Sequence, residues 1–96
     1  EEIRAGNQIV IKAKIILVDG SILHIREYID AKYNIDKINY AYQYQNEQGK
    51  LLFRYDNARH KPDMGFNDHK HLDDGSIMQH PAPHIADVVD EVIGYV

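Results

Sequence analysis

The 96-residue sequence contains no cysteine, and its longest apolar run extends only from Ile15 to Val18. Without cysteine the chain forms no disulfide bond, binds no cysteine-ligated zinc ion or iron–sulfur cluster, and has no thiol nucleophile. A helix that crosses a bilayer needs about 20 apolar residues, so the sequence predicts no membrane span. The first residues, Glu1 to Arg4, show neither the basic nor the apolar part of a secretory signal. We therefore expect a cytoplasmic protein.

Positively charged residues are fewer than negatively charged ones, since the sequence has 11 lysines and arginines and 15 aspartates and glutamates. The net charge of −4 argues against a broad surface for binding phosphate groups, while it leaves room for a local basic patch. The hydrophobic fraction of 44% and the charged fraction of 27% are those of a globular protein. A chain of this length forms one core, so we expect a single domain over residues 1–96. Histidine is abundant, and five of the six histidines lie between His60 and His84.

A first hairpin is predicted over residues 8–18 and 21–29, where apolar residues alternate with the period of a β-strand. An Asp-Gly turn signal lies between the two segments. A three-residue loop, residues 18–20, places Ile15 opposite Leu23 and aligns the apolar side chains on one face. The sequence therefore predicts a three-residue turn whose last residue, a glycine, adopts the left-handed conformation.

A second hairpin is predicted over residues 38–45 and 50–56, with residues 46–49 as a four-residue loop. This loop length places Tyr44 opposite Leu51 and aligns the aromatic side chains on one face. The alternating tyrosines of its first strand have two interpretations. They form a platform on which nucleic-acid bases stack, or they belong to the core. Alternation of aromatic residues within a hairpin favours the core.

The rest of the chain is predicted to form a loop and a helix. Residues 57–83 show no periodicity and are rich in His, Asp, Gly and Pro, which predicts a long loop of the kind that is commonly functional. In residues 84–96 the apolar residues recur at spacings of three and four, which predicts a helix with one apolar side. The predicted fold is therefore α+β, with a four-stranded antiparallel sheet of two hairpins and a C-terminal helix packed on one face.

Two motifs begin at the end of the second hairpin. Residues 55–60 read Tyr-Asp-Asn-Ala-Arg-His, and residues 69–71 read His-Lys-His. Together with the closing helix they resemble the TumE family of small toxins from type II toxin–antitoxin systems, which favours aromatic-Asp-Asn-Ala-Pro-His-His followed by His-Lys-His. Arg59 stands where proline is usual, and Lys61 replaces the second histidine of the family. The resemblance implies a prokaryotic toxin that stops growth and is neutralised by a DNA-binding antitoxin. RNA cleavage is expected by analogy with other small toxins.

The residues of these motifs suit RNA cleavage without a metal ion. The reaction needs a base for the 2′-hydroxyl, an acid for the leaving 5′-oxygen and a cation for the pentacovalent phosphate. Histidine suits the first two roles because its unperturbed pKa is about 6.5. We predict a catalytic site in which the carboxylate of Asp56 orients a histidine. Its other members are histidines and cations, namely His60, His69, His71, Lys70, Arg59 and Arg54. In an extended segment the histidines of residues 69–71 share one face and the lysine points to the other.

Three alternatives remain open. The first is a metal-dependent hydrolase with His60, His69 and His71 as ligands, or with the carboxylate of Asp56 or Asp73 in the set. In the second, the histidines hydrogen-bond to backbone carbonyls and hold the long loop against the sheet. The third is a non-enzymatic module that binds a partner protein through an exposed sheet edge and the tyrosines. The leading prediction is a toxin that acts on RNA with no cofactor.

Overall fold

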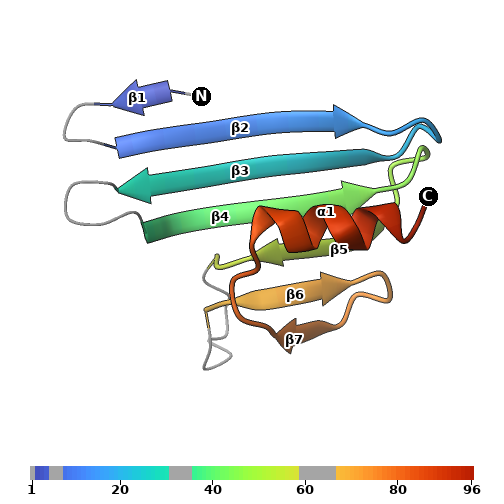
Figure 1. Cartoon of the computed structure of the whole chain (residues 1–96). Helices are drawn as coiled ribbons and strands as arrows, with labels where there is room; N and C mark the ends of the chain where they lie inside the picture. Colours follow the sequence, from blue (N-terminus) through green and yellow to red (C-terminus); the bar gives the residue numbers. More distant parts are fainter. Residues whose placement is uncertain (1, 5–7, 31–35, 59–66) are drawn as a thin grey trace.

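The computed structural model describes residues 2–4, 8–30, 36–58 and 67–96. These residues form one helix and one seven-stranded antiparallel sheet in which each strand pairs with the next along the chain (Figure 1). The elements are β1 (Glu2–Arg4), β2 (Gln8–Ile16), β3 (Ile22–Asp30), β4 (Asp36–Gln45), β5 (Leu51–Asp56), β6 (His69–Leu72), β7 (Ile77–Gln79) and α1 (Ile85–Ile93). The predicted α+β class is confirmed. The predicted number of four strands is wrong, because β1, β6 and β7 extend the sheet at its two edges.

The first hairpin, β2–β3, has the predicted register. Ile15 lies opposite Leu23, and Ala13 lies opposite Ile25. Backbone hydrogen bonds of 2.9 and 3.0 Å close the three-residue loop. Gly20 ends this loop with a φ of 84°, a conformation that glycine adopts without steric cost. The alternation of apolar residues and the turn residues agree here, so the local sequence specifies the pairing.

The second hairpin, β4–β5, has a register that differs from the prediction. Tyr44 lies opposite Phe53, two residues beyond its predicted partner. The loop is shorter than predicted, because the backbone N–H of Asn46 donates a hydrogen bond to the carbonyl of Lys50 at 2.9 Å. A β-bulge beside Tyr44 then adds one residue on β5. The two changes shift the pairing by two residues together, so Phe53 and Tyr55 keep their predicted face, whereas Leu51 pairs with Gln45 and Leu52 packs against the core in its place.

The segment predicted as one long loop, residues 57–83, contains the hairpin β6–β7. Its turn repeats that of the first hairpin, since residues 72–77 read Leu-Asp-Asp-Gly-Ser-Ile and residues 17–22 read Leu-Val-Asp-Gly-Ser-Ile. In each turn an aspartate accepts hydrogen bonds of 2.5–2.9 Å from the hydroxyl and the backbone N–H of the serine two residues later. These bonds lower the pKa of both carboxyls, Asp19 and Asp74. The repeated Leu-x-Asp-Gly-Ser-Ile motif is therefore the signal that predicts the additional hairpin.

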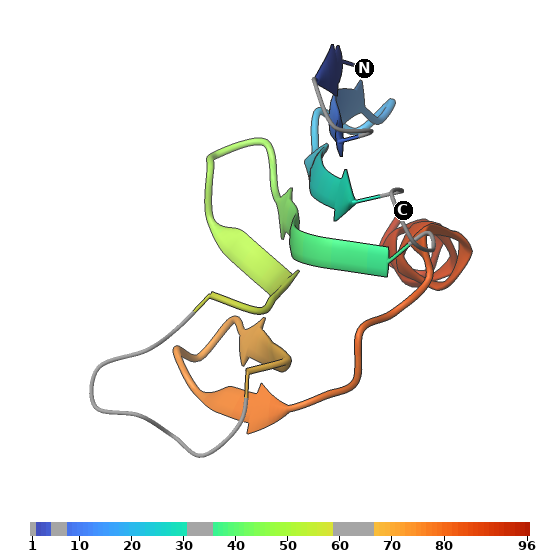
Figure 2. The same ribbon diagram turned by 90° about the vertical axis from the view of Figure 1, so that its left-hand side faces the viewer.

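Helix α1 lies against one side of the sheet, across β4 and β5 (Figures 1 and 2). It is shorter than the predicted helix of residues 84–96, because a glycine follows Ile93 and glycine is a poor helix former. Its apolar side buries Val88 and Val92 against the aromatic residues of β4 and β5. No helix of the described residues is long and apolar enough to cross a membrane.

The tyrosines of β4 belong to the core, which confirms the favoured interpretation. Tyr40, Tyr42 and Tyr44 are 5%, 0% and 1% exposed. The hydroxyl of Tyr42 donates a hydrogen bond to Glu27 at 2.9 Å, and that of Tyr44 donates to the hydroxyl of Ser21 at 2.8 Å. Because the rings are covered, these tyrosines offer neither a stacking platform for bases nor a contact surface for a partner protein.

We expect the protein to lose stability above about pH 10. Burial, together with the hydrogen bond to Glu27, raises the pKa of Tyr42 well above its usual range. Burial and the hydrogen bond to Asp68 raise the pKa of Tyr40 in the same way. Tyrosines of the unfolded chain ionise near pH 10, so above that pH the unfolded state binds fewer protons than the folded state. The free energy of unfolding therefore falls as the pH rises. Urea titrations at about pH 8 and about pH 11 measure this loss.

The variant Tyr42→Phe is the control for the alkaline loss, since it has no proton to release at that position. Its free energy of unfolding should decrease less between the two pH values than that of the native chain. Equal stability of the native chain at both pH values would contradict the expectation.

Candidate functional site

The two faces of the sheet carry different groups on β5 and β6. Side chains alternate along a strand, so neighbours in sequence point to opposite faces. Tyr55 and Lys70 point toward α1, where they donate hydrogen bonds of 2.5 and 2.7 Å to the two carboxylate oxygens of Glu91. Asp56 and His69, which pair with each other across β5 and β6, point to the side away from α1. We call this side the far face of the sheet (Figure 2).

Four side chains of β5 and β6 meet on the far face and form what we call the carboxylate cluster. Its members are Arg54, Asp56, His69 and His71. In the register of the two strands, Asp56 lies opposite His69 and Arg54 lies opposite His71. The ligand atoms of Asp56 and the two histidines all lie within 4.8 Å of one another. Sheet pairing thus brings together residues of two motifs that are separate in the sequence.

His69 is completely buried and connects a backbone carbonyl to the carboxylate of Asp56. Its Nδ1 lies 2.6 Å from the carbonyl oxygen of Asn67, so this nitrogen carries a proton. Its Nε2 contacts Oδ1 of Asp56. Both ring nitrogens face oxygens that only accept hydrogen bonds. His69 therefore holds the buried carboxylate in place and does not itself meet solvent.

The second carboxylate oxygen of Asp56, Oδ2, lies close to both Arg54 and His71. It accepts a hydrogen bond from Nε of Arg54 at 2.6 Å, and it lies 3.6 Å from Nε2 of His71. Gln43 fixes the guanidinium further, because its amide oxygen accepts a hydrogen bond from Nη1 of Arg54 at 2.7 Å. The side chains of Arg54 and His71 are 35% and 21% exposed, whereas that of Asp56 is 5% exposed. Solvent thus reaches a guanidinium and an imidazole that share one buried carboxylate.

Lys70, a predicted catalytic cation, lies apart from the carboxylate cluster on the helix side of the sheet. The predicted separation of the lysine from the two histidines of residues 69–71 is confirmed. Burial lowers the pKa of Lys70, but its hydrogen bonds to Glu91 and Tyr55 outweigh burial and hold the pKa above its usual value. The ion pair with Glu91 ties α1 to β6, which is a structural role.

The other predicted residues are distributed as follows. His60 and Arg59 lie outside the described residues. Asp73, considered as a metal ligand, is exposed in the β6–β7 turn and is not part of the group formed by Asp56 and the two histidines. His80 packs its ring against Tyr55 on the helix side, with the ring centroids 4.9 Å apart.

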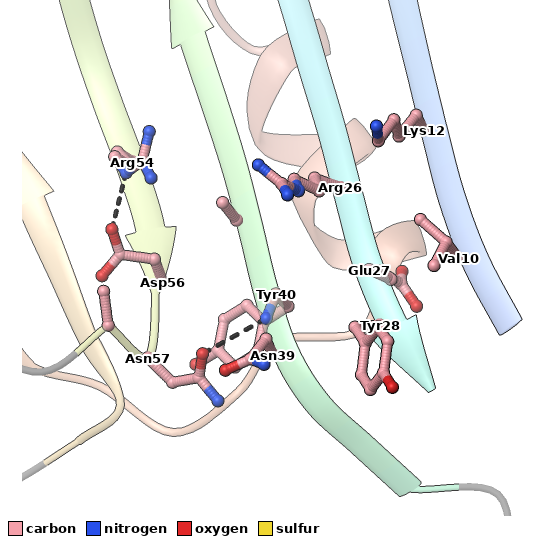
Figure 3. Close-up of a pocket in the computed structure, with 12 residues that line it drawn as sticks. Val10, Lys12, Arg26, Glu27, Tyr28, Asn39, Tyr40, Arg54, Asp56 and Asn57 are labelled. Carbon is pink, nitrogen blue, oxygen red and sulfur yellow. Dashed lines mark hydrogen bonds and ion pairs between the residues drawn. The ribbon is translucent and has the colours of Figure 1, made fainter. Parts of the chain in front are cut away.

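A hollow of about 430 Å³ adjoins the carboxylate cluster on the far face (Figure 3). Its lining includes Arg54 and Asp56 from the cluster and two further cations, Lys12 and Arg26. The register places Lys12, Arg26, Ala41 and Asp56 in one row across β2 to β5. The sequence-based site prediction missed Lys12 and Arg26. The alternation of the first hairpin was the available signal, since it places both cations on the polar face.

Comparison with known proteins identifies the family of the chain. No curated protein matches the sequence, and no solved structure matches it. A family model described as Toxin TumE matches residues 1–96, the whole sequence. The match covers both motifs, the three hairpins and the closing helix. The chain therefore belongs to the Toxin TumE family.

Proposed function

We propose that this chain is the toxin of a toxin–antitoxin pair and that it cleaves RNA without a metal ion at the carboxylate cluster. Membership of a toxin family implies a cognate antitoxin. One observation carries the proposed reaction: the imidazole of His71 and the guanidinium of Arg54, both partly exposed, share the buried carboxylate of Asp56. Cleavage at a phosphate needs both kinds of group, one to move protons and one to stabilise charge.

The proposed reaction uses the 2′-hydroxyl of the RNA as the nucleophile. His71 accepts the proton of this hydroxyl, and the 2′-oxygen bonds to the adjacent phosphorus. The bond from phosphorus to the 5′-oxygen of the next nucleotide breaks, and a general acid gives that oxygen a proton. The products are a 2′,3′-cyclic phosphate and a free 5′-hydroxyl. Arg54 donates hydrogen bonds to the phosphate oxygens, whose negative charge grows in the transition state.

The remaining residues of the motifs support these two groups. His60 is assigned the role of general acid and Arg59 that of a second cation, both from the sequence motif. Asp56 is a positioning residue, because its buried carboxylate holds the imidazole of His71 and the neighbouring guanidinium in place. His69 acts in turn through Asp56, since it is buried and contacts the carboxylate rather than the substrate.

Expression in a heterologous bacterium tests this function with a matched pair of histidine variants. We expect the native chain to stop growth and to degrade total RNA. His71→Ala should restore colony counts by about 100-fold or more, since a positioned acid or base contributes at least that factor in rate. His24→Ala is the control, because His24 lies on the same far face, on β3, but outside the cluster. It should be as toxic as the native chain.

The purified protein gives a second readout of the same proposal. It should leave 2′,3′-cyclic phosphate ends on RNA in the presence of EDTA, and circular dichroism should show that His71→Ala is folded. Normal growth and intact RNA with the native chain would contradict the proposal. Full toxicity of His71→Ala would contradict the role of that residue.

A metal-dependent hydrolase is the second candidate function. Asp56, His69 and His71 offer two imidazoles and one carboxylate, a set that several transition metals accept. The hydrogen bond between Nδ1 of His69 and a backbone carbonyl is also the usual support of a metal-binding imidazole. Arg54 weighs against a metal, because its guanidinium already neutralises the same carboxylate at 2.6 Å. One equivalent of zinc, nickel or manganese in protein purified without a histidine tag, with activity lost in EDTA, would favour the metal.

A further inference from the structure

The hollow beside the carboxylate cluster exists because β4 carries a small side chain at its centre. In the row across the sheet, Ala41 stands between Arg26 on β3 and Asp56 on β5. The methyl group of Ala41 lines the hollow and fills little of the space above β4. The long side chains of Arg26 and Arg54 extend from the strands on either side (Figure 3). The hollow therefore opens directly beside the guanidinium that the proposed reaction uses.

Two cations of the hollow have no anionic partner in the described part of the chain. Lys12 and Arg26 lie opposite each other on β2 and β3 and are exposed. The side chain of neither residue forms an ion pair or a hydrogen bond with the residues that the structure describes. Neighbouring strands are about 4.8 Å apart, so the strands of Arg26 and Arg54 are separated by about 10 Å. This separation leaves room for a second phosphate of one RNA strand at Lys12 and Arg26, beside a phosphate held by Arg54.

One end of the hollow carries an aromatic ring and an amide. Tyr28 and Asn39 are cross-strand partners on β3 and β4, and both line the hollow (Figure 3). Tyr28 is half-buried, and Asn39 is exposed. An aromatic ring stacks on the face of any unstacked base, and an amide both donates and accepts hydrogen bonds at the edge of a base. An anion alone needs neither group, so this end of the hollow suits a nucleotide better than free phosphate.

We infer that the hollow binds the nucleotide of a single-stranded RNA that lies next to the scissile bond. Its phosphate contacts Arg26 and Lys12, and its base lies between Tyr28 and Asn39. The position next to a scissile bond rests on the proposed function. The single-stranded form follows from the contacts, because bases inside an A-form duplex do not offer their faces for stacking.

Binding of short RNA tests this inference separately from cleavage. The probes are four fluorescent homopolymer RNA octamers, and fluorescence anisotropy is measured with protein that carries His71→Ala, so that the RNA remains intact. In this background, Tyr28→Ala and Arg26→Ala should each weaken binding about tenfold. Arg26→Ala should also reduce the dependence of log affinity on log salt concentration by about 1. Lys50→Ala is the matched control, because Lys50 is an exposed cation in the β4–β5 turn, away from the hollow, and should leave affinity unchanged.

The outcomes for the hollow and for the proposed function are distinct. If the native chain cleaves RNA but no octamer binds, or if Tyr28→Ala and Arg26→Ala bind as tightly as their parent, the nucleotide site is overturned and the proposed function stands. If both variants lose affinity while the native chain cleaves no RNA, the nucleotide site is supported and the proposed function is overturned. Equal affinity for single-stranded DNA octamers would overturn the assignment to RNA.

Discussion

Replacement of Asp56 by alanine is expected to lower the free energy of unfolding by about 3–5 kcal/mol. The side chain of Asp56 is 5% exposed, contacts Nε2 of His69 and accepts a hydrogen bond from Arg54. Without it, Nε2 of the buried His69 loses the carboxylate that it contacts, and the guanidinium loses its counter-ion. Urea unfolding at neutral pH measures the loss of stability, and the total-RNA assay should show loss of cleavage in the same variant.

Asp56→Asn is the control that separates the shape of this side chain from its charge. An amide has the size of the carboxylate and donates a hydrogen bond to a neutral His69, so we expect less than half the destabilisation of Asp56→Ala. The amide does not neutralise Arg54, so RNA cleavage should still fall by about 100-fold or more. A stability loss below about 1 kcal/mol in Asp56→Ala would show that the carboxylate does not hold the cluster together. Full activity of Asp56→Asn would show that its charge is dispensable.

Replacement of Tyr42 by alanine is expected to cost about 3–5 kcal/mol of stability. The side chain is completely buried, stacks on Tyr40 with ring centroids 5.4 Å apart, and lies between its cross-strand partners Ile25 and Tyr55. Its removal opens a cavity at the centre of the core beneath α1. A domain of this size has a total stability of about 5–14 kcal/mol, so the variant loses a large part of it. Thermal unfolding followed by circular dichroism measures the loss.

Two further tyrosine variants are the controls. One isolates the contribution of the Tyr42 hydroxyl, and the other changes an exposed tyrosine. Tyr42→Phe retains the ring but removes the hydrogen bond to the buried Glu27, so it should cost about 1–3 kcal/mol. Tyr95→Ala changes a tyrosine that is 51% exposed and should cost about 1 kcal/mol or less. Equal losses in Tyr42→Ala and Tyr95→Ala would show that burial in the core does not determine the cost.

The candidate site was only partly predictable from the sequence. The motifs identified Asp56, His69 and His71, because histidines and a carboxylate at these positions have few chemical roles. The additional hairpin was missed, although its turn repeats the sequence of the first turn. Arg26 and Tyr28, which line the hollow, were also missed, because no pattern in β3 indicates that this strand lies two strands away from β5, which carries Arg54.

The sequence by itself determined which side chains share a face of the sheet. Alternation is a property of the extended backbone, so it placed the tyrosines of β4 in the core and the two histidines of β6 on the side away from Lys70. Even a shift of two residues in the β4–β5 pairing left these faces unchanged. Only the tertiary structure decided which strands are neighbours and in which register. The contact between Asp56 and His69 depends on backbone hydrogen bonds between β5 and β6. No local sequence pattern encodes the pairing of two strands that are separated by a long stretch of chain.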